Sequence, residues 1–256
     1  MRRSPATHRE LPHAVWVLGQ AGLVALGVVA YFSIRGLTES SVGVAMRNAR
    51  SIMTFERDLG IDIESTLQAP VTSSEVLETF ANWVYIWGHW PVIIVTMVWL
   101  AWRHHETFLR LRDAMLVSGA LGMAVFVSYP VAPPRLIADD LVDTVTESSH
   151  AYRVLQPPAF VNQYAAMPSL HAGWDLLVGI AIVSAAGCLA LRVVGAAMPV
   201  LMAYSVVATA NHYVVDVFAG VVLVLIGHLV ALGLEARRRR RWDAREQRPE
   251  RVREPV

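Results

Sequence analysis

The sequence predicts an all-α integral membrane protein: a bundle of six transmembrane helices with an amphipathic helix on its outer side. Two observations lead to this fold class. Hydrophobic residues make up 55% of the 256-residue chain, and they gather in blocks of about 20, the length that crosses about 30 Å of hydrocarbon. Arginines cluster at the ends of these blocks in an alternating order that fits the positive-inside rule. The predicted spans are residues 13–33, 77–102, 109–129, 168–187, 192–210 and 213–234.

The positions of the arginines predict the orientation. They precede the first block, separate the second from the third and the fourth from the fifth, and follow the sixth. We therefore expect both termini in the cytoplasm and segments 34–76 and 130–167 on the outer side of the plasma (inner) membrane. The basic start also fits a signal peptide, but the first block is too long and lacks a small-residue cleavage site, which favours an uncleaved anchor.

We expect a single transmembrane catalytic domain over residues 1–236 and a cytoplasmic, arginine-rich tail over residues 237–256. The tail is polar enough to be disordered, and attraction to anionic lipid headgroups explains its arginines. Nucleic-acid binding is the weaker alternative for the tail, and no nucleic acid is among the expected partners.

The outer segment 40–60 predicts an amphipathic helix that lies on the membrane surface or caps the bundle. Gly60 suits the end of this helix. Glu56 falls within its apolar face, where a carboxylate is costly without a partner, so Glu56 either contacts the active site or forms a structural ion pair. The second outer segment holds a long loop, 136–166, which we expect to be functional. The apolar face of the amphipathic helix at 40–60 is formed by Val42, Ala45, Met46, Ala49, Ile52, Met53 and Leu59.

The second predicted span carries a polar stripe near its outer end. Asn82, Tyr85 and His89 recur at three- and four-residue spacing, which puts them on one face of a helix. They either form hydrogen bonds between helices, as is common in membrane bundles, or line one wall of a pocket. We count them as candidate substrate-binding residues.

Two short motifs carry most of the chemistry. Segment 167–175 reads MPSLHAGWD and segment 211–216 reads NHYVVD, and each places a histidine four residues before an aspartate. Residues four apart share a helical face, so we expect each aspartate to reach its own histidine. Titratable groups at membrane depth are costly and are by default functional. The two motifs therefore predict a reaction centre.

The predicted topology brings these motifs together. Pro168 suits the first turn of a helix, so the fourth span begins there, and its free N–H groups make an anion site at the outer boundary. His171 lies one turn further in, and His212 lies between the fifth and sixth spans. A proline-rich stretch after the third span fixes Arg135 at the same depth.

An arginine, a helix N-terminus and two histidines suit a phosphate group. Arginine offers a planar fork to phosphate oxygens. Histidine can attack phosphorus or give a proton to the leaving oxygen, and an aspartate on the far ring nitrogen fixes its tautomer. The candidate catalytic residues are His212, His171 and Asp216. The candidate substrate- or phosphate-binding residues are Arg135, Ser169, Asp175, Asn82, Tyr85 and His89.

The motif Pro168-Ser169-x-His171, followed by His212-x-x-x-Asp216, resembles the type-2 phosphatidic acid phosphatase superfamily of integral membrane enzymes. With the proline-rich Arg135 segment, it is similar to the inositol phosphorylceramide synthase branch, over roughly residues 75–235. The resemblance implies that His212 is a nucleophile that forms a phosphohistidine, with Asp216 as its orienting partner. It further implies that His171 is the general acid, that Arg135 clamps the phosphate, and that no metal or other cofactor takes part.

The chain also departs from the family pattern. Phosphatases of the superfamily carry a lysine with an Arg-Pro pair seven residues later, whereas here Ser128 replaces the lysine and Leu136 follows Arg135. A Ser-Arg pair before the second histidine motif is replaced by Ser205-Val206. Two cationic phosphate ligands are therefore missing. A phosphodiester, with one negative charge, fits this site better than the dianion of a phosphomonoester. Asp175 would either raise the pKa of His171 or accept hydrogen bonds from a polyol such as inositol.

These observations predict a membrane phosphotransferase that moves a phosphoryl-linked head group between a lipid and an acceptor at the outer leaflet. Its partners would be a phospholipid or polyprenyl-phosphate donor, a polar or glycan acceptor, and the bilayer. A lipid phosphate or pyrophosphate phosphatase is the first alternative. A transporter or a metal-dependent membrane enzyme is the second, since two histidines and two carboxylates could hold a divalent ion. A transporter would usually show an inverted repeat or broken mid-membrane helices, and the sequence suggests neither.

Overall fold

The computed structural model describes residues 42–148 and 164–246, together with the isolated positions 19, 22 and 27. The regular elements within this part are all helical. One isolated β-bridge pairs Val131 with Ala165, outside the helices. The predicted first span, 13–33, lies outside the described residues apart from three glycines. The helices are α2 (Val42–Leu59), α3 (Glu64–Thr72), α4 (Glu75–Trp87), α5 (Trp90–Arg103), α6 (His105–Ser128), η2 (Pro134–Leu136), α7 (Thr144–Ser148), α9 (Leu170–Ala185), α10 (Leu189–Ala208) and α11 (Val214–Glu246).

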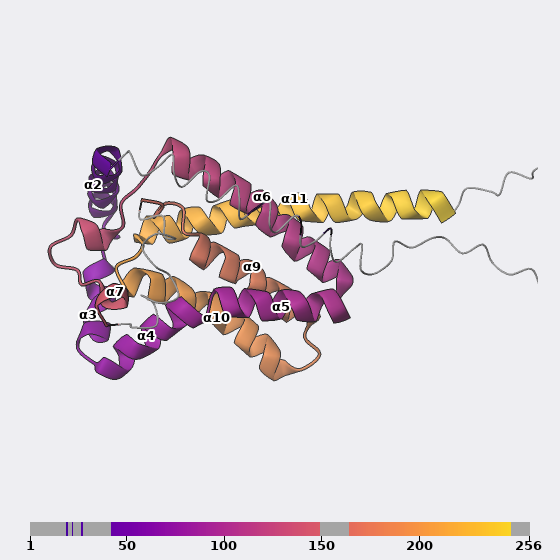
Figure 1. Ribbon diagram of the computed structural model, residues 1–256, viewed down its shortest axis with the longest axis horizontal. Helices are drawn as coiled ribbons and strands as arrows, with labels where there is room; N and C mark the ends of the chain where they lie inside the picture. Colours follow the sequence, from indigo (N-terminus) through magenta and orange to yellow (C-terminus); the bar gives the residue numbers. More distant parts are fainter. Residues whose placement is uncertain (1–18, 20–21, 23–26, 28–41, 149–163, 247–256) are drawn as a thin grey trace, which may run out of the picture.

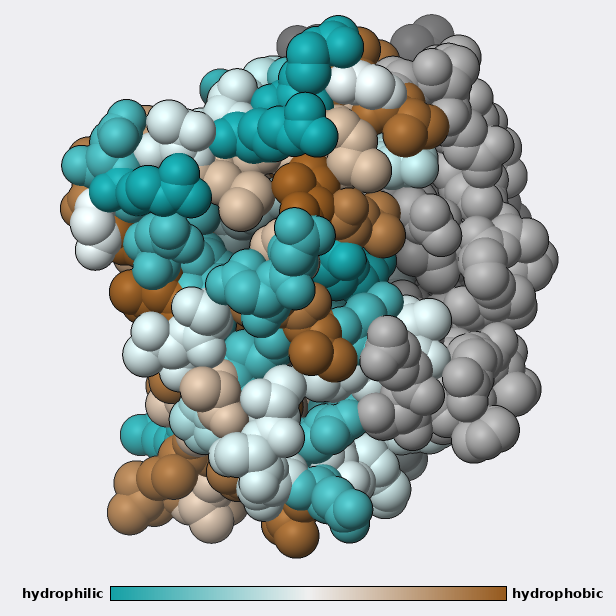
Figure 2. Space-filling view, turned by 90° about the vertical axis from the view of Figure 1, so that its left-hand side faces the viewer, coloured by the Kyte–Doolittle hydropathy of each residue, from teal (hydrophilic) through white to brown (hydrophobic). Residues whose placement is uncertain are grey.

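Long helices run along the molecule, and the shorter elements gather at one end (Figure 1). Helices α6, α10 and α11 are each long and apolar enough to cross a membrane, and the bent pair α4 and α5 would make a fourth span. Helix α9 is apolar but shorter, with 16 residues. These helices indicate a membrane protein. Figure 2 looks onto the end where α2, α3 and α7 lie, and it shows hydrophilic residues spread between apolar ones.

The second predicted span, expected to be one continuous helix, is broken. Helix α4 ends at Trp87, α5 begins at Trp90, and the two axes differ by 46°. His89 occupies the break and is buried. Its imidazole bonds to a carboxylate of another helix, as described below, so tertiary contacts hold the bend.

Two further boundaries differ from the prediction. The fourth span was expected to start at Pro168, but α9 starts at Leu170 because the Ser169 side chain caps it by accepting a hydrogen bond from the N–H of Ala172. The tail was expected to be disordered from residue 237, but α11 continues to Glu246. Its basic residues pair with α6: Arg238 bonds Asp113 at 2.5 Å.

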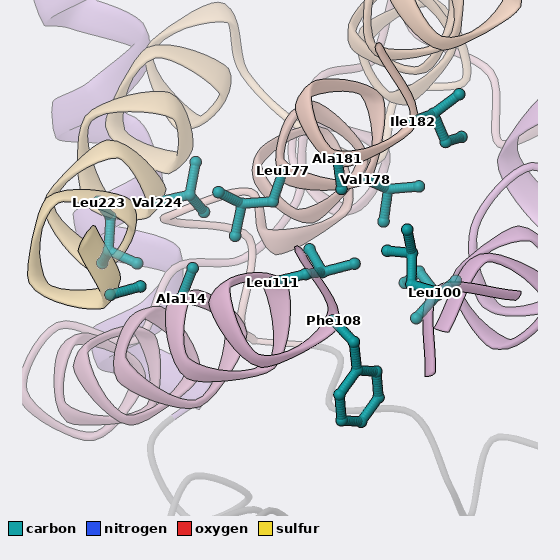
Figure 3. Packing of buried hydrophobic residues seen from close by; sticks show 12 residues of the cluster. Leu100, Phe108, Leu111, Ala114, Leu177, Val178, Ala181, Ile182, Leu223 and Val224 are labelled. Atoms are coloured by element: carbon teal, nitrogen blue, oxygen red, sulfur yellow. The ribbon is translucent and has the colours of Figure 1, made fainter. Parts of the chain in front are cut away.

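Helix α9 is the central helix of the bundle, since it contacts α5, α6, α10 and α11. Figure 3 shows the apolar side chains that fill the space between α6, α9 and α11, among them Leu111, Leu177 and Val224. In a membrane, lipid tails are as apolar as these side chains, so the close packing contributes mainly through van der Waals contacts. The bundle therefore holds α9 firmly from its middle to its C-terminal end.

Glycine lets α9 and α11 approach closely near the start of α9. A Cβ atom on Gly220 would lie 2.2 Å from the carbonyl oxygen of Ser169, and one on Gly173 would lie 2.7 Å from Val224 Cγ1. The N–H of Ser169 donates to the carbonyl of Asp216 at 2.9 Å. Backbone therefore lies against backbone where the two histidine motifs meet.

Candidate active site

Three histidines from separate parts of the chain form one cluster. His89 lies at the α4–α5 break, His171 in the first turn of α9, and His212 in the turn between α10 and α11. The ring centroids of His89 and His171 are 4.2 Å apart, and those of His171 and His212 are 6.0 Å apart. The Tyr85 ring stacks on His171, with centroids 4.9 Å apart. We call these four residues the histidine cluster.

The turn that carries His212 fixes the tautomer of this histidine. His212 Nδ1 lies 2.7 Å from the carbonyl oxygen of Ala166 and 3.4 Å from Asp216 Oδ2. A carbonyl oxygen can only accept, so Nδ1 carries the hydrogen and Nε2 keeps its lone pair. Asp216 Oδ2 also accepts from the N–H of Tyr213 at 2.9 Å. Asp216 therefore orders both the imidazole and its turn.

The same turn contains a strained residue. Ala210 has a φ of 56° and is fully buried, a backbone conformation that residues other than glycine rarely adopt. It persists because the turn is bonded on both sides: the N–H of Ala210 donates to Val207, and its carbonyl accepts from the N–H of Arg135. Strain of this kind often marks a functional site.

The expected pairing of His171 with Asp175 is wrong. Asp175 Oδ1 instead accepts from His89 Nδ1 at 2.8 Å, and both side chains are buried. The His171 ring is turned toward Tyr85 and His89, on which it packs. Among the described residues, no hydrogen-bond partner meets His171 Nε2 or Asp175 Oδ2, which leaves two buried polar atoms at the cluster for a ligand.

Arg135 lies beside the His212 turn, as the topology predicted. Its Nη1 donates to Asn211 Oδ1, and its backbone N–H donates to Ala210. Its Nε lies 3.2 Å from Asp143 Oδ2. Asp143 could not be found from the sequence, because no spacing rule relates an aspartate in a loop to an arginine eight residues earlier.

A sequence model of the PAP2 superfamily, the type-2 phosphatidic acid phosphatases, matches residues 50–230. The chain belongs to the PAP2 superfamily. The match contains the histidine cluster, Arg135 and Asp216. Members of the superfamily are phosphatases and phosphotransferases of lipid phosphates. No curated protein and no solved structure matches the chain significantly.

Two of the predicted binding residues of this PAP2 chain are bonded within the protein. Ser169 is fully buried, and its Oγ accepts from the N–H of Ala172. Asn82 is buried, and both ends of its amide bond Thr144: Nδ2 donates to the backbone carbonyl, and Oδ1 accepts from Oγ1, each at 3.0 Å. The contact of Ser169 and Asn82 with substrate stays a prediction.

Among the described residues, Glu56 forms no ion pair and instead bonds a backbone N–H. Its Oε1 accepts from the N–H of Val215 at 2.7 Å, and Glu64 Oε1 accepts from the N–H of Val214 at 3.0 Å. Both N–H groups belong to the first turn of α11, just after His212, where no carbonyl of the helix can accept from them. Burial raises the pKa of Glu56 to about 8, and the neighbouring carboxylates Glu64 and Asp216 add to the rise. Sequence patterns could not find this role, because the partners lie 150 residues or more away.

The raised pKa of Glu56 predicts a stability that falls with pH. Between pH 4.5 and about 8 the folded protein holds a proton that the unfolded chain has released, so the free energy of unfolding falls as the pH rises through this window. Because one pKa unit corresponds to about 1.4 kcal/mol, Glu56→Gln should be a few kcal/mol more stable than the wild type at pH 9 and similar to it at pH 5.

Thermal unfolding in detergent at these two pH values measures the difference. Asp58→Asn, an exposed change on the same helix, is the control and should not differ from the wild type at either pH. A Glu56→Gln advantage that is equal at pH 5 and pH 9 would contradict the assignment.

In the part of the chain that the structure describes, no three side chains of His, Cys, Asp or Glu are grouped as metal ligands would be. The two aspartates of the motifs instead bond different histidines: Asp175 with His89 and Asp216 with His212.

Proposed function

We propose that the chain is a membrane phosphotransferase that moves a phosphoryl-linked head group, such as inositol phosphate, from a lipid to an acceptor through a phosphohistidine. The observation that carries this proposal is the state of His212. Its Nδ1 is bonded to the Ala166 carbonyl, which leaves Nε2 as a nucleophile beside the ring of His171. The similarity of the motifs to the inositol phosphorylceramide synthase branch supports the head-group transfer.

The reaction has two steps. In the first step, His212 Nε2 attacks phosphorus, the bond from phosphorus to the leaving oxygen breaks, and His171 gives that oxygen a proton. Asp216 and the Ala166 carbonyl stabilise the positive charge that the His212 ring gains. In the second step, the acceptor hydroxyl attacks the phosphohistidine, His171 takes its proton, and His212 is released.

Transfer is favoured over hydrolysis of a phosphomonoester by the charges of the site. The site lacks the lysine and the second arginine that accompany the equivalent of Arg135 in phosphatases of the superfamily. Ser128 and Val206 occupy those two positions. Fewer cations suit a phosphodiester with a single negative charge. Hydrolysis of lipid phosphates is the second candidate function, since the superfamily contains phosphatases as well as phosphotransferases.

We propose the predicted orientation, with the active site on the outer side of the plasma membrane and both termini in the cytoplasm. The histidine cluster lies at the start of α11. The ion pairs between α6 and α11, Arg110 with Glu235 and Asp113 with Arg238, lie toward the other end of α11. This separation supports the positive-inside arrangement. Exposed Phe55 and Leu59 on α2 support its contact with the membrane surface. Six spans in one catalytic domain complete the proposal.

The test is lipid turnover by the purified protein in detergent with a strong chelator present. Labelled phosphatidylinositol and polyprenyl-phosphate donors are supplied with and without polar acceptors. Product that forms only with an acceptor supports transfer and identifies the donor. Released phosphate or phosphorylated head group without an acceptor makes the protein a hydrolase. Activity that the chelator removes would favour the metal-dependent alternative.

Asp216→Asn should retain a small fraction of the activity. The amide cannot stabilise the positive ring as a carboxylate does, and the turnover number should fall by roughly 10²- to 10⁴-fold. Single-turnover kinetics with the donor identified above measure the loss, and thermal unfolding checks that the variant folds. A folded Asp216→Asn protein with near-normal turnover would remove Asp216 from the mechanism.

A further inference from the structure

The arginine assigned to the phosphate already has a counter-ion. Arg135 Nε lies 3.2 Å from Asp143 Oδ2, and the two side chains are 10% and 20% exposed. Arg135 Nη1 bonds the neutral amide of Asn211. A guanidinium has five N–H donors, so these two contacts leave donors for phosphate oxygens. The carboxylate of Asp143, however, offsets the positive charge that a phosphate would meet.

Asp143 is held in place by the construction of its loop. Its Oδ1 accepts from the N–H of Thr146 at 3.0 Å and so caps α7. On one side, Gln68 bonds both backbone groups of Val142, at 2.9 Å to the N–H and 2.8 Å to the carbonyl. On the other side, Thr144 is bonded to Asn82. These bonds on both sides therefore fix the position of the Asp143 carboxylate beside Arg135.

This arrangement has a consequence for the substrate. A phosphate bound by the remaining donors of Arg135 lies close to the Asp143 carboxylate, in a half-buried site where charges are weakly screened. A dianion is repelled by Asp143 about twice as strongly as a monoanion, because the energy is proportional to the product of the charges. Like-charge contacts of this kind are a common means of excluding a competing ligand.

We propose that Asp143 is a specificity-determining residue that restricts the site to phosphodiester donors with one negative charge and disfavours phosphomonoester dianions. This inference rests on the proposed function, since it takes Arg135 as the phosphate clamp. Asp143 contacts neither phosphorus nor the histidines in this scheme. It acts through the charge that it places beside Arg135.

The test compares two lipids of different charge. We would measure kcat/KM for phosphatidylinositol, a phosphodiester, and for phosphatidic acid, a phosphomonoester, in the wild type and in Asp143→Asn. The asparagine keeps the shape of the side chain and can still cap α7. The ratio of phosphatidic acid to phosphatidylinositol activity should rise by roughly tenfold, the effect of about 1.4 kcal/mol, and chiefly through KM. Asp140→Asn, at an exposed position of the same loop, should leave the ratio unchanged.

An unchanged ratio in Asp143→Asn, or a shift toward the diester, would overturn the proposal. If Asp143→Asn loses activity on both lipids, Asp143→Ser serves as the second variant, because serine also caps a helix and carries no charge. Equal losses on both lipids in both variants would make Asp143 a structural residue and would equally overturn the proposal. The proposed function is judged separately, by whether the wild type needs an acceptor.

Discussion

Replacing His212 with alanine should reduce lipid turnover to the background rate, a loss of roughly 10⁴-fold or more. Alanine supplies no nucleophile, so the phosphohistidine of the proposed first step cannot form. The His212 ring contacts Ala166, Asp216 and His171, so its removal alters the site and little of the apolar core. Rapid acid quench with a phosphorus-labelled donor should trap a phosphoprotein in the wild type and none in the variant.

The matched control is His105→Ala, which removes an exposed histidine at the start of α6. This variant should turn over lipid at the wild-type rate. Near-normal turnover by a folded His212→Ala protein would exclude the phosphohistidine mechanism. Loss of turnover in both variants would point to a general effect on the bundle.

Gly220→Ala should impair both stability and turnover. The added Cβ would lie 2.2 Å from the carbonyl oxygen of Ser169 and 3.0 Å from its carbonyl carbon. These are backbone atoms, so no side-chain rotation can relieve the overlap, and α9 must move away from α11. Overpacking of this kind costs about 1–3 kcal/mol, which should lower the melting temperature by roughly 3–10 °C.

The shift would also separate His171 from the His212 turn, since Ser169 N–H bonds Asp216 directly. A displacement of about 1 Å can reduce turnover by roughly a hundredfold. Gly233→Ala is the matched control on the same helix, because its added Cβ meets nothing within 4 Å and alanine favours a helix. Equal melting temperatures and rates for the two variants would show that the close packing of α9 on α11 is unimportant.

The sequence was most informative where a pattern reflects one helix alone. Apolar blocks located α6, α10 and the start of α11 to within a few residues, because burial in hydrocarbon requires a long run of apolar side chains. The approach of Asp216 to His212 was predicted for a similar reason, since one turn of backbone connects them. Membership of the PAP2 superfamily followed from the same two motifs.

Patterns failed where a partner comes from elsewhere in the fold. His171 and Asp175 have the same spacing as the second pair, yet Asp175 bonds His89 on a segment 86 residues away. Helical spacing shows which residues can meet but cannot show which competitor lies closer. The pairing of Arg135 with Asp143 has the same origin. The extension of α11 to Glu246 depends on α6, whose acidic groups bind its arginines.

The two sides of the candidate site differ in how easily evolution could change them. Where Gly173 and Gly220 join α9 to α11, backbone atoms are in contact and a larger side chain does not fit. Beside Asp143, the loop is held by the amide side chains of Gln68 and Asn82, and other polar residues could form equivalent bonds. On the proposed role of Asp143, changes in this loop would alter which lipids bind, while the proposed phosphorus chemistry depends on the packing of α9 on α11.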